Sequence, residues 1–263
     1  MVKEVCRLLS LMHKPIELGA IPSASPVLAF GDPLNSRVAT LGLNPSNLEF
    51  MDQSGHELTA PYHRFESLST LQVSDWSAVS SQGARQIWQR CEEYFQRYPY
   101  DQWFKQLERV LVGTGASYYA TLGVRACHLD LVPFATAKKW SDLKSAVRAQ
   151  LLELGTPSLV KVLVASDIQV LILNGSTVVK EFGRLIPNQP LQANPMPLWS
   201  LQNGRVGGTA YFGRVRRVGQ FELGREILVL GFNHNIQSSF GVTTEVKSRI
   251  AGWIGQISAS ALA

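Results

Sequence analysis

The sequence has few cysteines and no long apolar run. Its three cysteines, Cys6, Cys91 and Cys127, lie far apart and match no metal-ligand spacing, so we expect reduced thiols. No apolar stretch is long enough to span a bilayer, and Glu4 and Arg7 interrupt the apolar core that a signal peptide needs. These absences predict a soluble, cytoplasmic protein with no membrane partner.

Acidic residues are scarce relative to basic ones. The chain has 25 lysines and arginines against 20 acidic residues, which gives a formal net charge of +5. Between residues 203 and 225 a single acid, Glu222, stands among five arginines: Arg205, Arg214, Arg216, Arg217 and Arg225. An excess of this kind favours an acidic partner such as nucleic acid, and its position indicates where that partner would bind.

The length and the apolar pattern predict one α/β domain. A chain of 263 residues that is 45% hydrophobic can form one sizeable core, so we expect a single domain over residues 1–263. Apolar runs predict strands at 37–43, 123–132, 169–174 and 227–232. Helical patterns occur at 3–13, 82–98, 101–112, 141–154, 157–166 and 243–257, and a further helix starts at 175–176. Strands that alternate with helices predict three α/β/α layers around a central, mainly four-stranded parallel sheet.

The segment at about 187–224 departs from this alternation. It is rich in glycine and proline, and we expect it to be an inserted basic β-hairpin with strands at 206–212 and 215–221.

Polar residues stand at the ends of the predicted strands. Asn44, Asp130, Asn174 and His234 each lie at or near such an end. In open parallel sheets ligands bind outside the carboxyl ends of the strands. An amide, a carboxyl and an imidazole are therefore expected to converge on one crevice.

Four short segments around these residues resemble the uracil-DNA glycosylase superfamily. Residues 42–46 (GLNPS) resemble its first motif, which reads Gly-Met-Asn-Pro-Gly in single-strand-selective members and Gly-Gln-Asp-Pro-Tyr in uracil-specific ones. Residues 234–239 (HNIQSS) are similar to the second motif, His-Pro-Ser-Pro, in the histidine and its place after the last strand. Residues 128–134 (HLDLVPF) resemble the strand that carries the base-reading Asn, and residues 62–67 (YHRFES) lie where the family places a stacking aromatic.

The resemblance implies a monofunctional DNA glycosylase that hydrolyses the N-glycosidic bond of a flipped base and leaves an abasic site. An extruded base would stack on Phe65 in a pocket that also includes Gly42, Pro45 and Ser46. Asn44 would position the attacking water, since an amide is too weak a base to deprotonate it. His234 would donate to the base O2, where negative charge develops as the base leaves.

Asp130 stands where the family has its base-reading Asn. An Asn both donates and accepts, which suits the uracil edge, whereas a carboxylate accepts only and cytosine offers it the N4 amine. A carboxyl group here would also protonate or hydrogen-bond N3 and so ease the departure of cytosine. We therefore expect a cytosine-type base, and Asp130→Asn is expected to shift the preference toward uracil.

Position 5 of the pyrimidine is the second departure from the family pattern. Uracil-specific members place a Tyr after the motif proline, which blocks a C5 substituent, whereas this chain has the smaller Ser46 followed by a long polar loop. This favours a cytosine with a bulky C5 group, such as the hydroxymethylated or glucosylated cytosine of certain phage DNAs. The resemblance would then imply an anti-phage glycosylase.

DNA contacts are expected from the turns and from the basic segment. The turn at Ser176 would present backbone amides to a phosphate, and the second motif implies contacts from Asn235 and Ser238. The cluster of Arg214, Arg216 and Arg217 is expected to contact backbone phosphates, with a solvated surface as the plainer interpretation. The DNA would be the partner of a monomer.

Neither a metal nor another cofactor is expected. Three dispersed cysteines cannot supply the four ligands of the iron–sulfur cluster that some family branches hold. His56 and His63 lack matching carboxylate or cysteine spacing for a metal site. His128 shares a strand face with Asp130, so it would either orient that carboxyl or have a plain core role.

Three other functions remain open. The first is a nucleic-acid-binding module that kept the fold and lost catalysis. The second is a nucleoside or nucleotide hydrolase, which would have no use for the arginine-rich insertion. The third is a repair glycosylase that removes uracil or hypoxanthine.

Overall fold

A seven-stranded mixed sheet is the centre of the computed structural model, which describes residues 1–237 and 241–263. The strands described are β1 (Val38–Gly42), β2 (Ala116–Ser117), β3 (Val124–Asp130), β4 (Val170–Asn174), β5 (Gln192–Leu201), β6 (Val206–Val218) and β7 (Phe221–Phe232). Their order in the sheet is β2-β3-β1-β4-β7-β6-β5. The β1–β4, β4–β7 and β2–β3 pairs are parallel, and the β7–β6 and β6–β5 pairs are antiparallel.

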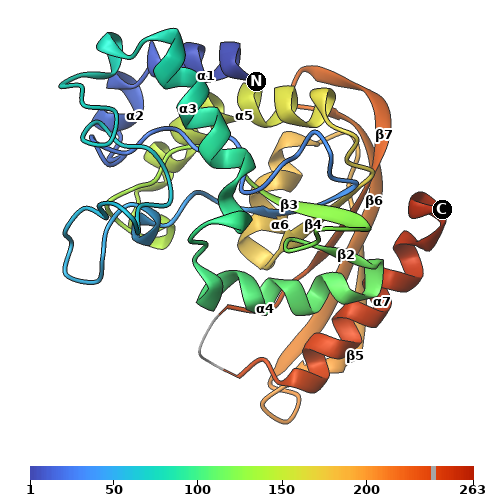
Figure 1. Cartoon of the computed structure of the whole chain (residues 1–263). Helices are drawn as coiled ribbons and strands as arrows, with labels where there is room; N and C mark the ends of the chain where they lie inside the picture. Colours follow the sequence, from blue (N-terminus) through green and yellow to red (C-terminus); the bar gives the residue numbers. More distant parts are fainter. Residues whose placement is uncertain (238–240) are drawn as a thin grey trace. The chain divides into compact units, whose positions relative to one another are not determined.

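Helices lie on both sides of the sheet (Figure 1). The α-helices described are α1 (Val2–Leu9), α2 (His13–Glu17), α3 (Ser81–Glu92), α4 (Asp101–Leu111), α5 (Ser145–Ala165), α6 (Ser176–Leu185) and α7 (Thr244–Leu262). Short 3-10 helices are η1 (Asn47–Glu49), η2 (Trp76–Ala78), η3 (Tyr94–Gln96), η4 (Val112–Thr114) and η5 (Trp140–Asp142). The α/β class is confirmed. The two helices expected at 141–154 and 157–166 are one helix, α5, which continues through Pro157.

The four predicted strands are present as β1, β3, β4 and β7. The sheet differs from the predicted four-stranded, mainly parallel one because it has seven strands and includes antiparallel pairs. The insertion does not form a separate hairpin, because β6 and β5 extend the same sheet beyond β7. The turn expected between 212 and 215 is also wrong, since Gly213 pairs with Val229 and Arg214 with Leu228 within one continuous strand. Gly213 is a strand glycine: a Cβ built there would lie 2.9 Å from the Leu191 side chain. A glycine that close packing requires within a strand looks the same in the sequence as a glycine in a turn.

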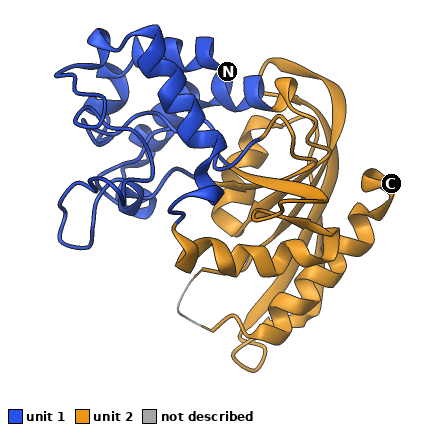
Figure 2. Ribbon diagram, viewed as in Figure 1, with its two compact units in different colours: residues 1–32, 43–99, 129–162 blue, residues 33–42, 100–128, 163–263 orange. Residues whose placement is uncertain are grey.

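The described chain divides into two compact units, shown in Figure 2. Unit 1 comprises Met1–Asp32, Leu43–Pro99 and Leu129–Val162, and unit 2 comprises Pro33–Gly42, Tyr100–His128 and Leu163–Ala263. The expectation of a single domain over residues 1–263 stays a prediction.

Each unit has its own apolar interior. In unit 2, β4 and residues 227–232 of β7 are almost wholly buried, and α6 and α7 both pack on these two strands. A strand covered on both faces needs the continuous apolar sequence found in these two strands. In unit 1, the rings of Phe30, Phe65 and Tyr94 meet with centroids 5.0–5.2 Å apart.

None of the helices in the described ranges has both the length and the apolar character needed to cross a bilayer.

Candidate functional site

Asn44 is fixed by its side-chain nitrogen. Its Nδ2 lies 3.1 Å from the carbonyl oxygen of Pro45, 3.3 Å from that of Phe134 and 3.0 Å from Oγ1 of Thr136. The Thr136 hydroxyl donates in turn to the carbonyl of Lys138 at 2.7 Å, so toward Asn44 it accepts. Main-chain carbonyls can only accept, which identifies the atom that faces them as the amide nitrogen. The amide oxygen Oδ1 of Asn44 is therefore the end left to bind a ligand or a water.

Asp130 and Asn44 lie on neighbouring stretches of unit 1. Asp130 is the half-buried last residue of β3. Two residues later, the amide of Val132 donates to the carbonyl of Leu43 at 2.9 Å, directly before Asn44. The segment that follows β3 thus runs beside the segment that follows β1. The main-chain segments that carry the predicted carboxyl and amide therefore lie side by side.

A second carboxyl group, Glu49, belongs to the same neighbourhood and was not predicted from the sequence. Ser46 caps η1, with its Oγ accepting from the Leu48 amide at 3.2 Å, and this turn directs the Glu49 side chain into the interior, where 4% of it is exposed. The hydroxyl of Tyr94 donates to Glu49 Oε2 at 2.8 Å, and Arg64 Nε lies 3.8 Å from the same oxygen.

Burial dominates the protonation of this carboxyl. It raises the pKa of Glu49 to about 7, against the lowering effects of Arg64 and the Tyr94 hydrogen bond. The negative charge of Asp130 adds to the increase, which shows that the two carboxyl groups interact. A polar loop without periodicity gave no signal for Glu49, because its partners are distant in sequence.

Phe65 is deeply buried in unit 1. It is 2% exposed, and its ring stacks on Tyr94 with centroids 5.0 Å apart and an interplanar angle of 16°. Phe50 lies 5.7 Å away between centroids. Base stacking on Phe65 stays a prediction. Tyr62, from the same sequence segment, is the more accessible aromatic, with 55% of its surface exposed.

In unit 2, the parallel strands β1, β4 and β7 end at one edge. Leu41 pairs with Leu173, directly before Gly42 and Asn174, and Asn174 pairs with Phe232, the last residue of β7. The sequence placed these ends correctly, because a buried parallel strand is a continuous apolar run that stops at a polar residue.

Ser176, at the start of α6, lies beside the segment that follows β7. Its amide donates to the carbonyl of Asn233 at 3.2 Å. Gly175, between β4 and α6, has φ +91°, a conformation that favours glycine. Ser176 and Asn235 are exposed, as a contact with DNA requires, whereas Ser238 lies outside the described residues.

His234 is buried and hydrogen-bonded. Only 3% of it is exposed, and its Nε2 lies 2.7 Å from the main-chain oxygen of Trp199. That oxygen accepts, so Nε2 carries a hydrogen, and in a neutral ring Nδ1 then carries none. While this bond lasts, His234 can donate to a second group only as an imidazolium ion.

The predicted arginine cluster lies on β6 and is paired with acids. Arg216 Nε donates to Glu226 at 2.9 Å, and Arg214 lies 3.8 Å from the same carboxylate. Arg217 bonds to Glu222. All three arginine side chains are at least half exposed.

The register of β6 and β7 places the arginine cluster away from the strand ends. Arg214 pairs with Leu228 and Arg217 with Glu222, whereas β7 ends at Phe232. Counted along β6 from Ala210, which pairs with Phe232, the two positions lie about 13 and 23 Å away at about 3.3 Å per residue. Contact of these arginines with DNA stays a prediction.

His128 has a buried partner inside unit 2. Its Nδ1 lies 2.7 Å from Oγ1 of Thr40, which is also 2.5 Å from the hydroxyl of Tyr118. The rings of Trp103 and Phe104 lie 5.0 and 5.4 Å from the imidazole. These contacts agree with a plain core role for His128, which is one of the two roles that the sequence left open. Among residues 1–237 and 241–263, no group of three or more His, Cys, Asp or Glu side chains has the arrangement of a metal site.

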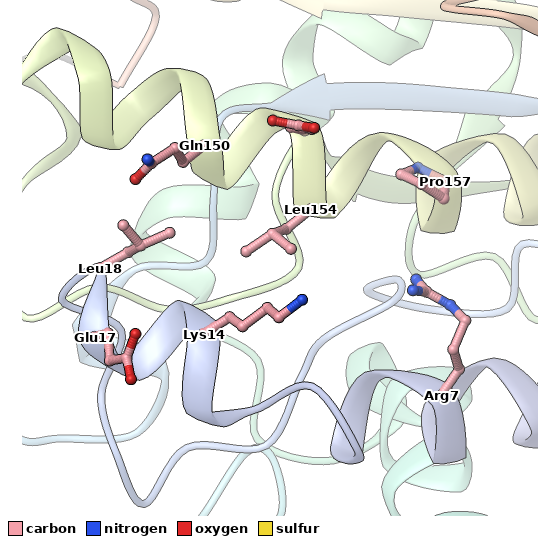
Figure 3. A pocket seen from close by; sticks show the side chains of 8 residues that line it. Arg7, Lys14, Glu17, Leu18, Gln150, Leu154 and Pro157 are labelled. Atoms are coloured by element: carbon pink, nitrogen blue, oxygen red, sulfur yellow. The ribbon is translucent and has the colours of Figure 1, made fainter.

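Figure 3 shows a separate cleft in unit 1, of about 460 Å³. Arg7 and Lys14 reach it from α1 and α2, and Gln150, Leu154 and Pro157 line it from α5. Glu17, Leu18 and Glu153 complete the lining. None of the predicted site residues lines this cleft.

The structure therefore groups the candidate residues in two sets: Asn44, Ser46, Glu49, Phe65 and Asp130 in unit 1, and Gly42, Asn174, Ser176, His234 and Asn235 in unit 2. Comparison of the sequence with models of known protein families gives no match, and comparison with curated proteins gives none.

Proposed function

We propose that this chain is a monofunctional DNA glycosylase that hydrolyses the N-glycosidic bond of an extruded cytosine carrying a substituent at C5. The observation that carries the proposal is the fixed amide of Asn44 beside the strand segment of Asp130. An amide held by its nitrogen presents its oxygen, and a carboxyl beside it presents a hydrogen-bond acceptor. The amide oxygen can orient a water nucleophile, and the carboxyl can accept a hydrogen bond from the N4 amine of cytosine.

Asn44 supplies orientation to the attacking water. Its Oδ1 accepts one hydrogen from the water and holds the water oxygen toward C1′ of the nucleotide. The water attacks C1′ as the bond to the base nitrogen breaks, and its proton passes to solvent. The network through Thr136 keeps the amide from rotating.

Asp130 recognises the base, and Glu49 sets the charge around it. A carboxylate accepts from N4 of cytosine, while a protonated carboxyl donates to N3 and eases the departure of the base. With the pKa of Glu49 raised to about 7 by burial, this second carboxyl holds a proton below neutral pH. The charge beside Asp130 therefore changes near physiological pH.

His234 is the proposed hydrogen-bond donor to the leaving base. It donates to O2 of the leaving base, where negative charge develops, and its bond to the Trp199 carbonyl fixes the ring. A donor of this kind acts on the transition state more than on the bound substrate, so its loss mainly lowers the chemical rate.

The C5 substituent follows from the size of Ser46. This half-buried residue caps η1, and its side chain is smaller than the tyrosine that would block a C5 substituent. Cytosines with hydroxymethyl or glucosylated hydroxymethyl groups occur in phage DNA, so the proposed role is defence against phage.

The test is mass spectrometry of the bases freed from matched DNAs that contain cytosine, 5-hydroxymethylcytosine, glucosylated 5-hydroxymethylcytosine, uracil or hypoxanthine. We expect one modified cytosine to dominate, and Asp130→Asn to shift the product toward uracil. The same base preference in Asp130→Asn would remove the role of Asp130. Uracil or hypoxanthine as the dominant product of the unmodified protein would replace the proposal with a repair function.

A further inference from the structure

The turn between β5 and β6 extends past the carboxyl end of the sheet. Ala210 of β6 pairs with Phe232, the last residue of β7, and β6 begins four residues earlier, at Val206. At about 3.3 Å per residue, Val206 lies about 13 Å beyond the end of β7. We call residues 202–207, together with Leu198 on β5, the β5–β6 tip.

The segment that carries His234 holds the base of this tip. The side chain of Asn233 donates to the carbonyl of Gly207 at 2.8 Å and accepts from the amide of Thr209 at 2.9 Å. His234 bonds to the carbonyl of Trp199, next to Leu198. The tip is therefore tied to the same segment as the proposed imidazole.

Close packing and an unusual turn define the shape of the tip. A Cβ at Gly208 would lie 2.3 Å from that of Trp199, so this glycine allows the two strands to approach. Gln202, Asn203 and Gly204 have φ values of 51°, 56° and 89° in succession. Positive φ values of this kind are those of a tight hairpin turn, so the turn between β5 and β6 has a fixed backbone shape.

The side chains of the tip are of the kinds that contact nucleic acid. Leu198 is 68% exposed and Val206 is 40% exposed, and all residues in 202–207 are exposed. Arg205 is the single charged residue between Ile186 and Gly213, and within the described chain it forms no ion pair. Arginine and amide side chains contact phosphates and base edges, and exposed leucine or valine can wedge between base pairs.

From this arrangement we infer that the β5–β6 tip contacts the DNA beside the extruded nucleotide, with Leu198 and Val206 against the opened base stack and Arg205 on a backbone phosphate. The inference rests on the proposed glycosylase function, since extrusion of a base leaves a gap in the base stack that an apolar side chain can fill. A second copy of the chain is a poorer occupant. Pro195 and Pro197 interrupt the N–H groups of β5 that an added strand would pair with.

The test measures binding and base release separately. Fluorescence anisotropy with a labelled duplex that contains a stable abasic analogue, and with the same duplex intact, gives dissociation constants over a range of NaCl concentrations. The variants are Arg205→Ala, Leu198→Ala and, as a matched exposed arginine on α3, Arg85→Ala. Circular dichroism checks that each variant is folded.

We expect Arg205→Ala to weaken binding and to reduce the slope of log affinity against log salt by about 1, the value for one phosphate contact. Leu198→Ala should weaken binding to the abasic duplex several-fold more than binding to the intact one. Arg85→Ala should leave the slope unchanged.

Unchanged binding in both tip variants, a slope that falls in Arg85→Ala instead of Arg205→Ala, or no binding by the unmodified protein would overturn the inference. A dimer that Leu198→Ala converts to a monomer would also overturn it, since the tip would then contact a second copy. Base release by the unmodified protein keeps these outcomes apart from the proposed function. If the unmodified protein releases the base and the tip variants bind DNA normally, only the inference about the tip is overturned. If binding depends on the tip but no base is released, only the proposed glycosylase function is overturned.

Discussion

The two sets of candidate residues are held in place in different ways. In unit 1, Asn44 and Glu49 lie in a loop and a short turn. The side chains of Thr136 and Tyr94, which are far away in sequence, help to hold them, and two main-chain carbonyls also bond to Asn44. In unit 2, His234 lies two residues after the buried end of β7 and bonds to a main-chain carbonyl. The first set depends in part on side-chain partners, and the second depends on the sheet.

This difference decides which substitutions should be damaging. A side-chain network is lost when one member changes, whereas a main-chain partner cannot be removed by substitution. We therefore expect graded effects around Asn44 and Glu49, and small effects around His234 apart from His234 itself.

The largest effect is expected when one residue of each set, Asn44 or His234, is replaced. Asn44→Ala and His234→Ala should each lower the single-turnover rate of base release by about 10²–10³. If both groups act on one nucleotide, the double variant should lose much less than the product of the two factors. The rate is measured with enzyme in excess over DNA, and exposed His13→Ala is the control. Strictly multiplicative losses would separate the two sets.

The next effect concerns the stability of unit 1. The pKa of Glu49 rises from its ordinary value of 4.5 to about 7 through burial, so the folded state binds the proton more tightly than the unfolded state. The associated stability is fully present below pH 4.5 and is lost as the pH rises to 7, a decline of about 3 kcal/mol.

Glu49→Gln should remove this decline, because an amide does not titrate. Urea unfolding at pH values from 5 to 8 measures it, with the exposed Glu153→Gln as control. A decline that persists in Glu49→Gln would mean that another group causes it.

A smaller effect tests the support of the Asn44 amide. Thr136→Val removes an acceptor from Nδ2, a hydrogen bond worth about 1 kcal/mol, so base release should slow by about fivefold. Thr136→Ser keeps the hydroxyl and should retain the normal rate. Equal rates in all three proteins would show that this hydroxyl does not orient the amide.

The smallest effect belongs to unit 2. Asn233→Ala removes the bonds to Gly207 and Thr209, yet the Trp199 carbonyl still holds His234. We expect base release to slow by about threefold, with a smaller change in Asn233→Asp, which keeps the acceptor for Thr209. Single-turnover rates of base release by the two variants measure this difference. A loss as large as that of His234→Ala would make the side chain of Asn233, and not the sheet, the main support.

What the sequence could predict follows the same division. The ends of β1, β4 and β7 were predictable, since buried parallel strands are continuous apolar runs with polar residues after them. Glu49 was not, because a carboxyl in a polar loop looks solvated until Tyr94 and Arg64 are brought to it. The register of β6 was also missed. Gly213 resembles a turn residue, and only pairing with β7 shows that it lies within a strand.

The arginine-rich segment illustrates the limit of composition. Counting charge between residues 203 and 225 omits Glu226, which lies next to that segment and pairs with Arg214 and Arg216. Arg205, which the same count treats as one of five, stands apart at the tip. Pairing partners and strand register, which the sequence does not contain, decide which arginine is available to a phosphate.

The most direct test of the central claim is a mass balance on DNA with one modified cytosine per molecule. The free base is quantified by mass spectrometry, and abasic sites are quantified by alkaline strand cleavage in the same sample. The account predicts equal amounts of the two products, with both lost in Asn44→Ala. DNA that is bound by the protein but yields neither free base nor abasic sites would contradict it.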